Sequence, residues 1–211
     1  MTFNAVLLAG GESRRMGSDK ATIVFEGSPL WQRQTELLRS LRPERIFVSA
    51  RQKPSWLPLE TELLLDEPVS RGPLSGLTRA LERMQTSHLI VLAVDMPFMT
   101  GEQMQALWSL ATIGCGVLPM VGKRAEPLAA IYPREASGDF LAALASDDFS
   151  MQRLSRHLVE KGMLRVLQVS PGDEELYRSV NEPGDFEKTP ANSTPEFRRC
   201  ATGRTPLRLP S

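Results

Sequence analysis

Short apolar runs alternate along the chain with longer segments in which apolar residues recur at helical spacing. The runs predict strands at residues 3–8, 45–50, 61–66, 88–94, 114–119, 126–133 and 164–169. The helical spacing predicts helices that begin at Ser28, Gly72, Thr100, Ser137 and Ser150. Strands and helices that alternate in this way are typical of an α/β domain, so we expect three layers with a mainly parallel central sheet.

Several residues predict how these helices begin and pack. We expect Ser28 to cap its helix, with Pro29 at the first helical position. Thr100 and Gln103 form a capping-box pattern. Gly76 permits close packing near the start of its helix, because it has no side chain. The helix from residue 137 should bury Phe140, Leu141 and Leu144.

The first strand is followed by a loop that is rich in glycine and positive charge. Gly10 and Gly11 allow backbone N–H groups to approach a ligand closely. Arg14, Arg15 and Lys20 follow in the same loop. Because ligands of open α/β sheets bind at the carboxyl ends of the strands, this combination suits a polyphosphate. The spacing is neither that of a P-loop nor that of a dinucleotide-binding fingerprint, and the alternative is a glycine turn with solvated charges.

Two carboxylates follow predicted strands and so belong to the same edge of the sheet. Asp66 is the first polar residue after three leucines, and Asp95 ends the apolar run of residues 88–94. A carboxylate such as Asp95 at the tip of a central strand can hold a hard cation beside a nucleotide; the alternative is that it caps the next turn. The two histidines, His88 and His157, offer no general base there.

Composition narrows the classes of partner. Lysine plus arginine equal aspartate plus glutamate at 25 each, so no overall basic field favours nucleic acid or a membrane. Cys115 and Cys200 form neither a disulfide framework nor a metal cluster, which suits the cytoplasm. The first apolar run is too short to span a bilayer and lacks a basic leader, so we expect no export. We expect one domain over residues 1–187 and a disordered tail with proline and arginine over residues 188–211.

Residues 8–20 carry the motif L-A-G-G-x-S-x-R-M-G-x-D-K, which resembles the signature of the molybdenum cofactor guanylyltransferases, a group of nucleotidyltransferases. Residues 66–76 are similar to the D-x-x-x-x-x-G-P-L-x-G block of that family. Residues 127–132 resemble its P-L-x-A-x-Y strand, and residues 181–185 its N-x-P-x-D element. The resemblance covers roughly residues 3–187.

The resemblance implies a Rossmann-like nucleotidyltransferase fold and a reaction. GMP would pass from GTP to the terminal phosphate of molybdopterin, with release of pyrophosphate. Asp95 would hold Mg²⁺, while Arg15 and Lys20 would hold the leaving pyrophosphate; these three are the implied catalytic residues. The residues implied to bind the nucleotide are Leu8, Ala9, Gly10, Gly11, Lys20, Asp66 and Asp95, and those on the acceptor side are Pro127 and Asn181. A monomer or weak oligomer is expected, with transient contacts to proteins that handle molybdopterin.

The chain departs from the family pattern at a few positions. The family has an asparagine after the second strand, where this chain has residues 49–51, Ser-Ala-Arg. Glu126 stands before Pro127 in place of an amide or imidazole. One alternative is therefore a cytidylyltransferase that acts on molybdopterin or another alcohol phosphate. The other is a non-catalytic nucleotide-binding module, although such a module has no need of both Lys20 and Asp95.

Overall fold

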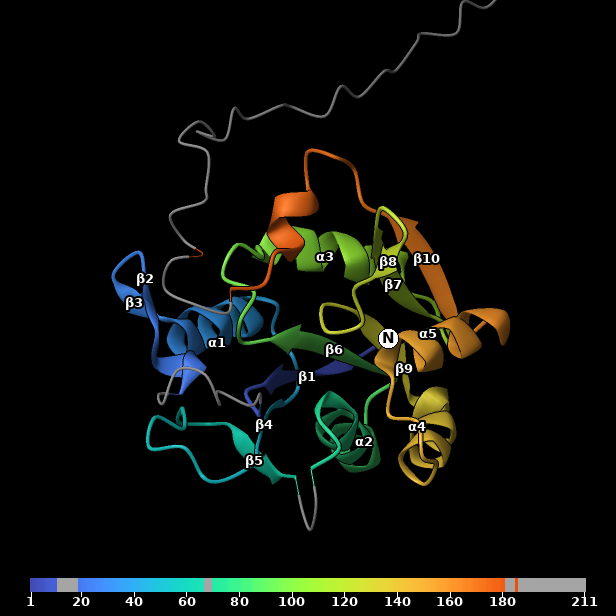
Figure 1. Ribbon diagram of the computed structural model, residues 1–211, viewed down its shortest axis with the longest axis horizontal. Coiled ribbons are helices and arrows are strands. Elements are labelled where there is room, and N and C mark those ends of the chain that lie inside the picture. Colours follow the sequence, from blue (N-terminus) through green and yellow to red (C-terminus); the bar gives the residue numbers. More distant parts are fainter. Residues whose placement is uncertain (11–18, 67–69, 181–184, 186–211) are drawn as a thin grey trace, which may run out of the picture.

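The computed structural model describes residues 1–10, 19–66, 70–180 and 185, and it centres on a mixed sheet with helices on both faces (Figure 1). The described sheet has eight strands, seven of them in the order β10-β7-β9-β6-β1-β4-β5, with β8 paired to β7. Their bounds are β1 Phe3–Leu8, β4 Ile46–Ala50, β5 Glu62–Leu65, β6 His88–Ala93, β7 Gly116–Val121, β8 Arg124–Ala125, β9 Ile131–Pro133 and β10 Leu164–Gln168. The prediction of a mainly parallel α/β sheet is confirmed.

The order of the strands reverses at β1. The chain moves outward from β1 to β4 and β5, and then returns to β6 on the opposite side of β1, with all four strands parallel. In register, Leu8 lies opposite Ser49 of β4 and opposite Ala93 of β6. The carboxyl ends of three strands therefore meet at the point where the order reverses, which is where open α/β sheets bind ligands. β9 runs antiparallel to its neighbours β6 and β7.

The helices divide between the two faces of the sheet. Helices α1 (Leu30–Ser40) and α3 (Gly101–Leu110) cover one face. Helices α2 (Pro73–Arg83), α4 (Ser137–Leu144) and α5 (Met151–Glu160) cover the other. Short 3₁₀ turns lie at η1 (Lys20–Thr22), η2 (Arg134–Ala136) and η3 (Glu174–Tyr177). These are the three layers that the alternating pattern predicts.

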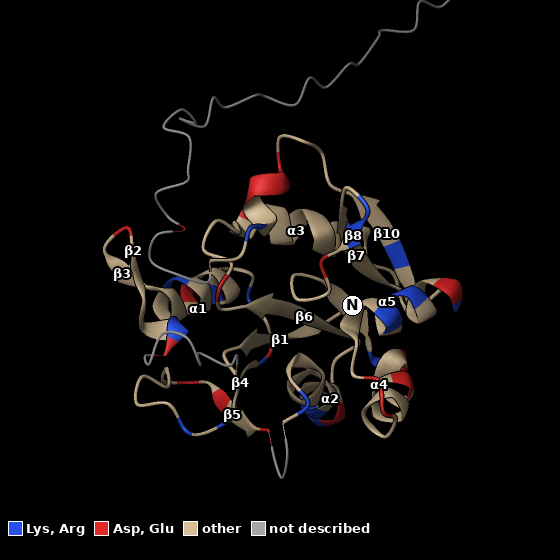
Figure 2. Ribbon diagram, in the orientation of Figure 1, with Lys and Arg blue, Asp and Glu red and all other residues tan. Residues whose placement is uncertain are grey.

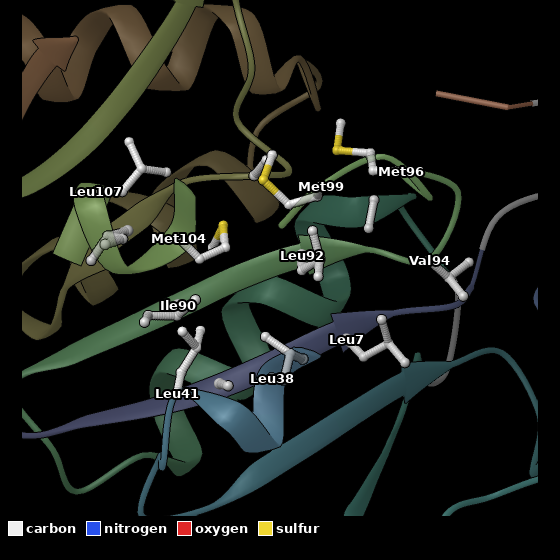
Figure 3. Close-up of a cluster of buried hydrophobic side chains, with 14 of the residues drawn as sticks. Leu7, Leu38, Leu41, Ile90, Leu92, Val94, Met96, Met99, Met104 and Leu107 are labelled. Atoms are coloured by element: carbon white, nitrogen blue, oxygen red, sulfur yellow. The ribbon is translucent and has the colours of Figure 1, made fainter. Parts of the chain in front are cut away.

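β1 and β6 form the centre of the core, and all of their residues are buried. Their side chains alternate between the faces, so that Leu7 and Leu92 pack under α1 and α3, while Val6 and Val91 pack under α2. Figure 3 shows the cluster of buried side chains under α1 and α3, in which Leu38 of α1 lies near Leu7. Neither strand contains Lys, Arg, Asp or Glu, and these residues lie instead on the helices, the loops and the outer strands (Figure 2).

The prediction that Ser28 and Pro29 begin a helix is wrong. They form strand β3 (Ser28–Pro29), which pairs with β2 (Val24–Phe25), and α1 begins at Leu30 without a side-chain cap. Glu26 and Gly27, which join the two strands, both have positive φ, at 49° and 82°. That geometry is typical of the tight turn of a β-hairpin, and the hairpin takes up the residues that would otherwise cap the helix.

Two further predictions need correction. Residues 126–130 are not part of the strand predicted at 126–133: they form a turn in which the Ala129 N–H donates to the Glu126 carbonyl, and β9 starts only at Ile131. Leu141 is 43% exposed rather than buried. Phe140 and Leu144 share one face of α4 because they are four residues apart, whereas Leu141 is rotated away from it.

The start of α3 is confirmed in part. The Gln103 N–H donates to the Thr100 hydroxyl at 3.2 Å, as a cap requires. Among the described residues no hydrogen bond from the Thr100 N–H to the Gln103 side chain completes the capping box, and the Gln103 side-chain amide donates to the Tyr177 hydroxyl at 2.8 Å. No helix among the described residues has the length and apolar character to cross a membrane. The tail at 188–211 lies outside the described residues.

Gly76 is confirmed as a point of close packing, and it provides a test of the contact between α2 and β4. A Cβ at Gly76 would overlap the Ser49 hydroxyl. We expect Gly76→Ala to lower the free energy of unfolding by about 1–3 kcal/mol, since overpacking forces the neighbours apart. Urea denaturation measures the change.

Gly138→Ala is the matched control, because Gly138 is also helical but a Cβ there would meet nothing within 4 Å. We expect this change to be neutral or to stabilise the protein by about 0.5–1 kcal/mol. Equal effects at the two glycines would show that the contact with Ser49 is not tight.

Candidate active site

A pocket of about 320 Å³ opens at the carboxyl edge of the sheet, where the order of the strands reverses. Its walls come from the ends of β1, β4, β5 and β6 and from the start of α2. Each implied nucleotide-binding residue that the structure describes lines this pocket: Leu8, Ala9, Gly10, Lys20, Asp66 and Asp95. Gly11 and Arg15 lie outside the described residues. The structure thus brings together residues that are far apart in the sequence.

The backbone after β1 passes between the two neighbouring strands. The Ala9 N–H donates to the Ser49 carbonyl at 2.8 Å, and the Val94 N–H donates to the Leu8 carbonyl at 3.0 Å. A Cβ at Gly10 would stand 3.0 Å from an oxygen of Asp66, which is tighter than ordinary contact. Glycine at position 10 therefore lets the backbone lie against the Asp66 carboxylate without crowding it.

Asp66 presents a fixed carboxylate to the pocket. Its N–H donates to the Ala50 carbonyl at 3.2 Å, which holds it at the end of β5. The hydroxyls of Ser49 and Ser70 donate to its two oxygens, Oδ1 and Oδ2, each at 3.1 Å. The residue is only 7% exposed. Because a carboxylate oxygen can accept more than one hydrogen bond, Asp66 keeps the capacity to accept from a ligand.

Lys20 and Asp95 form an ion pair in the pocket. The Lys20 Nζ lies 3.9 Å from Asp95 Oδ2, with 19% and 24% of the two side chains exposed. Lys20 is carried by η1, whose first residues are held by Asp19. The Asp95 carbonyl accepts from the Val180 N–H at 2.7 Å, so a segment near the carboxyl end of the described chain returns to support this loop.

Burial raises the pKa of Asp95 above its ordinary value, and the nearby Lys20 opposes part of that rise. A partly desolvated carboxylate gains more from a cation than one in water, because less solvent screens the attraction. The described residues contain no group of three or more His, Cys, Asp and Glu side chains that could enclose a metal ion. A single carboxylate suits Mg²⁺, which usually takes one or two carboxylates plus substrate phosphates and water.

Three features of the pocket were not predicted from the sequence. Arg51, which follows β4, adds a second described cation to the lining. Gly72 and Pro73 also line it, so the N-terminus of α2 points its partial positive charge at the pocket. The third is the hydroxyl of Ser49, whose hydrogen bond to Asp66 depends on the pairing of β4 with β5. The Gly-Pro helix start after Asp66 is the sequence signal that could have pointed to the second of these.

The implied acceptor residues are placed only in part. Leu128 lines the pocket, whereas Pro127 does not. The Pro127 carbonyl accepts from the Tyr132 hydroxyl at 2.9 Å. Glu126 lies in the same turn, and burial raises its pKa although Arg124, 3.7 Å away, opposes the rise. Asn181 lies outside the described residues.

Both histidines lie outside the pocket lining. His88 starts β6, at the opposite end from Asp95, and its Nε2 lies 3.0 Å from the Thr112 carbonyl. Burial lowers the pKa of His88, which favours the neutral form of the ring. His157 is on the surface of α5, where it pairs with Asp139. Neither side chain can therefore act as a general base for a ligand in this pocket.

The chain matches known proteins over most of its length. A family model described as "MobA-like NTP transferase domain" matches residues 5–163. A protein of Opitutus terrae named "Probable molybdenum cofactor guanylyltransferase" is 36% identical over 86% of this chain and 92% of its own length.

Solved structures share the fold at lower sequence identity. Molybdopterin-guanine dinucleotide biosynthesis protein A from Archaeoglobus fulgidus has a TM-score of 0.70 at 22% identity, over 87% of this chain and 95% of its own. A nucleotidyl transferase from a Methanothermobacter species also has a TM-score of 0.70, at 14% identity over 88% of this chain and 94% of its own. The three-layer fold is therefore that of nucleotidyltransferases.

The raised pKa of Asp95 gives a prediction for stability against pH. Between its ordinary value of 3.8 and the raised value, folded Asp95 keeps a proton that the unfolded chain has released. Its contribution to the free energy of unfolding therefore falls as pH rises through that window and is constant above it. We expect the stability of Asp95→Asn relative to wild type to increase over the same window, measured by urea denaturation at a series of pH values.

Asp139→Asn is the control with the opposite sign. Burial alone would raise the pKa of Asp139, but hydrogen bonds from Lys161 and His157 outweigh burial and lower it. That variant should lose stability relative to wild type as pH rises through the carboxylate range, because wild-type Asp139 stabilises the fold when ionised. A parallel response of the two variants would contradict the assigned direction for Asp95.

Proposed function

Since the chain belongs to the MobA-like NTP transferase family, we propose that it transfers GMP from GTP to the terminal phosphate of molybdopterin. Pyrophosphate leaves, and the guanine dinucleotide form of the molybdenum cofactor is made. The observation that carries the proposal is that Lys20, Asp66 and Asp95 line one pocket, at the point where the order of the strands reverses. The relative from Opitutus terrae, matched over 92% of its length, carries the name of this activity.

The donor triphosphate lies over the backbone of residues 8–10, between Lys20 and the start of α2. The N-terminus of α2 and the cations of Lys20 and Arg51 together favour several negative charges at this place. Arg15 stays part of the proposal on the motif alone, because it lies outside the described residues. Asp95 holds Mg²⁺, which when bound neutralises phosphate charge as a Lewis acid.

The chemistry needs positioning more than proton transfer. An oxygen of the acceptor phosphate forms a bond to the α-phosphorus of GTP, while the bond from that phosphorus to the β-phosphate oxygen breaks. The acceptor oxygen is already anionic near neutral pH, so the absence of both histidines from the lining costs nothing. Lys20 neutralises the charge that grows on the leaving pyrophosphate, and it stands there before the reaction begins.

Asp66 selects the base in this proposal. Guanine presents two adjacent donors, N1–H and the 2-amino group, and an ionised carboxylate only accepts. Ser49 and Ser70 fix the Asp66 oxygens, so the carboxylate need not reorganise when it binds. The cytidylyl alternative fits this group less well, because the cytosine edge places the acceptor N3 beside its amino donor and N3 would face a second acceptor.

The non-catalytic alternative is disfavoured by the ion pair in the pocket. A module that only bound nucleotides would gain little from a desolvated carboxylate beside the phosphates, since the two repel one another without a metal ion. The chain instead keeps Asp95 beside Lys20 at 3.9 Å.

The proposal of a cytoplasmic monomer or weak oligomer, in transient contact with molybdopterin-handling proteins, rests on the sequence.

The base preference can be measured without the acceptor. With Mg²⁺ present, GTP should raise the melting temperature more than CTP, ATP or UTP, because a ligand at 100 times its Kd stabilises by about 2.7 kcal/mol. Asp66→Asn should reduce the preference of GTP over ATP by about tenfold or more, since one hydrogen bond to a charged group is lost. A thermal-shift panel followed by titration gives both numbers, and a preference for CTP would overturn the guanylyl proposal.

Asp95→Asn separates catalysis from folding. The variant should release no measurable pyrophosphate from GTP and molybdopterin, because it loses the carboxylate that aligns the metal and the phosphates. It should still melt at least as high as wild type at neutral pH, since a desolvated charge has been removed. Asp139→Asn, which changes a half-buried carboxylate outside the active-site pocket, should keep full turnover, and wild-type rates in Asp95→Asn would refute the metal assignment.

A further inference from the structure

Two tryptophans from separate elements stack beside the segment that carries Lys20. Trp31 belongs to α1, and Trp56 belongs to the loop between β4 and β5. Their ring centroids lie 5.5 Å apart with an angle of 13° between the planes. The Trp56 Nε1–H donates to Asp19 Oδ2 at 2.6 Å. The stack therefore places an indole donor on the residue that directly precedes Lys20.

Asp19 uses its other carboxylate oxygen on the turn that follows. Its Oδ1 accepts from the Ala21 N–H at 3.0 Å. Its carbonyl accepts from the N–H and the hydroxyl of Thr22, at 2.9 and 2.8 Å. Ala21 is fully buried in the core. The turn η1 is therefore held on one side by the core and on the other by Asp19, whose orientation depends on Trp56.

Lys20 is the first residue of this turn, and its ammonium faces Asp95 in the pocket. A lysine side chain has a limited length, so the position of its backbone sets which oxygens the ammonium can reach. A hydrogen bond to an ionised carboxylate is stronger than one between neutral groups. Trp56 thus has the chemistry and the location to fix the backbone at residue 20, although it does not line the pocket itself.

We propose that Trp56 is a positioning residue for Lys20. It holds Asp19 through its indole N–H, Asp19 orients the turn η1, and the stack on Trp31 fixes the indole. The inference rests on the proposed function only for what Lys20 binds, the leaving phosphates of a nucleoside triphosphate. Trp56 lies in the β4–β5 loop, which belongs to none of the motifs that carry the family resemblance.

The first test examines Lys20 directly and needs no substrate. Trp56→Phe keeps an aromatic ring for the stack but removes the N–H donor. Brief acetylation with acetic anhydride, read by peptide mass spectrometry, should modify Lys20 at least about threefold faster in this variant, because the lysine spends more time away from Asp95. Lys161, which pairs with Asp139 on the surface, is the internal standard and should react at its wild-type rate.

Leu59→Ala is the matched control, because Leu59 lies in the same loop and is 85% exposed. It should leave the acetylation of Lys20 unchanged. Equal acetylation rates of Lys20 in Trp56→Phe and wild type would overturn the proposal.

The second test measures turnover. In Trp56→Phe, kcat with GTP and molybdopterin should fall about tenfold while KM for GTP rises less, since Lys20 interacts most with the charge of the leaving group. A merely structural role would instead lower the melting temperature and leave kcat of the folded enzyme unchanged. Leu59→Ala should keep the wild-type kcat.

A double-mutant cycle tests whether Trp56 acts through Asp19. Asp19→Asn can keep one oxygen for the Ala21 N–H but then turns its amide toward the indole, so it loses the same hydrogen bond. The combination of Trp56→Phe with Asp19→Asn should therefore be no slower than the slower single variant, and additive losses would overturn the proposal. If wild type released no pyrophosphate with any nucleotide, the proposed function would fail, while the acetylation result would still decide the role of Trp56.

Discussion

The alignment of β1 with β4 on one side and β6 on the other is the constraint on which the pocket depends. Leu8 stands opposite Ser49 and Ala93, so three strands end at one level and release their following residues into the same space. The hydrogen bonds from Ala9 to Ser49 and from Val94 to Leu8 extend that alignment beyond the strands. Because β1 and β6 are buried on both faces, a shift of one residue would exchange the side chains that pack under α1 and α3 with those that pack under α2, and neither cluster would fit.

Electrostatic features of the pocket follow from that burial. Asp66 and Asp95 are less accessible to water than surface carboxylates, because both lie at the end of a sheet that is covered by helices. The protein compensates differently at the two places. Asp66 accepts hydrogen bonds from two hydroxyl groups, whereas Asp95 has the Lys20 ammonium nearby and a pKa that burial raises. In the proposed function, the first carboxylate accepts from the guanine edge and the second holds the metal ion beside the phosphates.

Support for the pocket comes from segments that lie far from it in the sequence. Val180 holds the Asp95 carbonyl from near the carboxyl end of the described chain, and Trp56 holds Asp19 from the loop between β4 and β5. Gly76 allows α2 to approach β4 closely enough for its N-terminus to reach the pocket lining. Several packed elements therefore hold Lys20 and Asp95 in the pocket, as the proposed catalysis by positioning would require.

The sequence by itself determined the order of strands and helices, the parallel sheet and most of the pocket, because apolar periodicity and strand-end placement are local signals. Glycines, a lysine and two carboxylates that follow buried strands had to meet once those strands were parallel. Tertiary structure alone decided the rest. The hairpin at residues 24–29 replaced a predicted helix cap, since the backbone at Glu26 and Gly27 takes up positive φ. Leu141 turned outward on α4. The partners of Asp66 and Asp19 come from Ser49 and Trp56, and no spacing along the chain reveals such contacts, because they depend on how separately formed elements pack together.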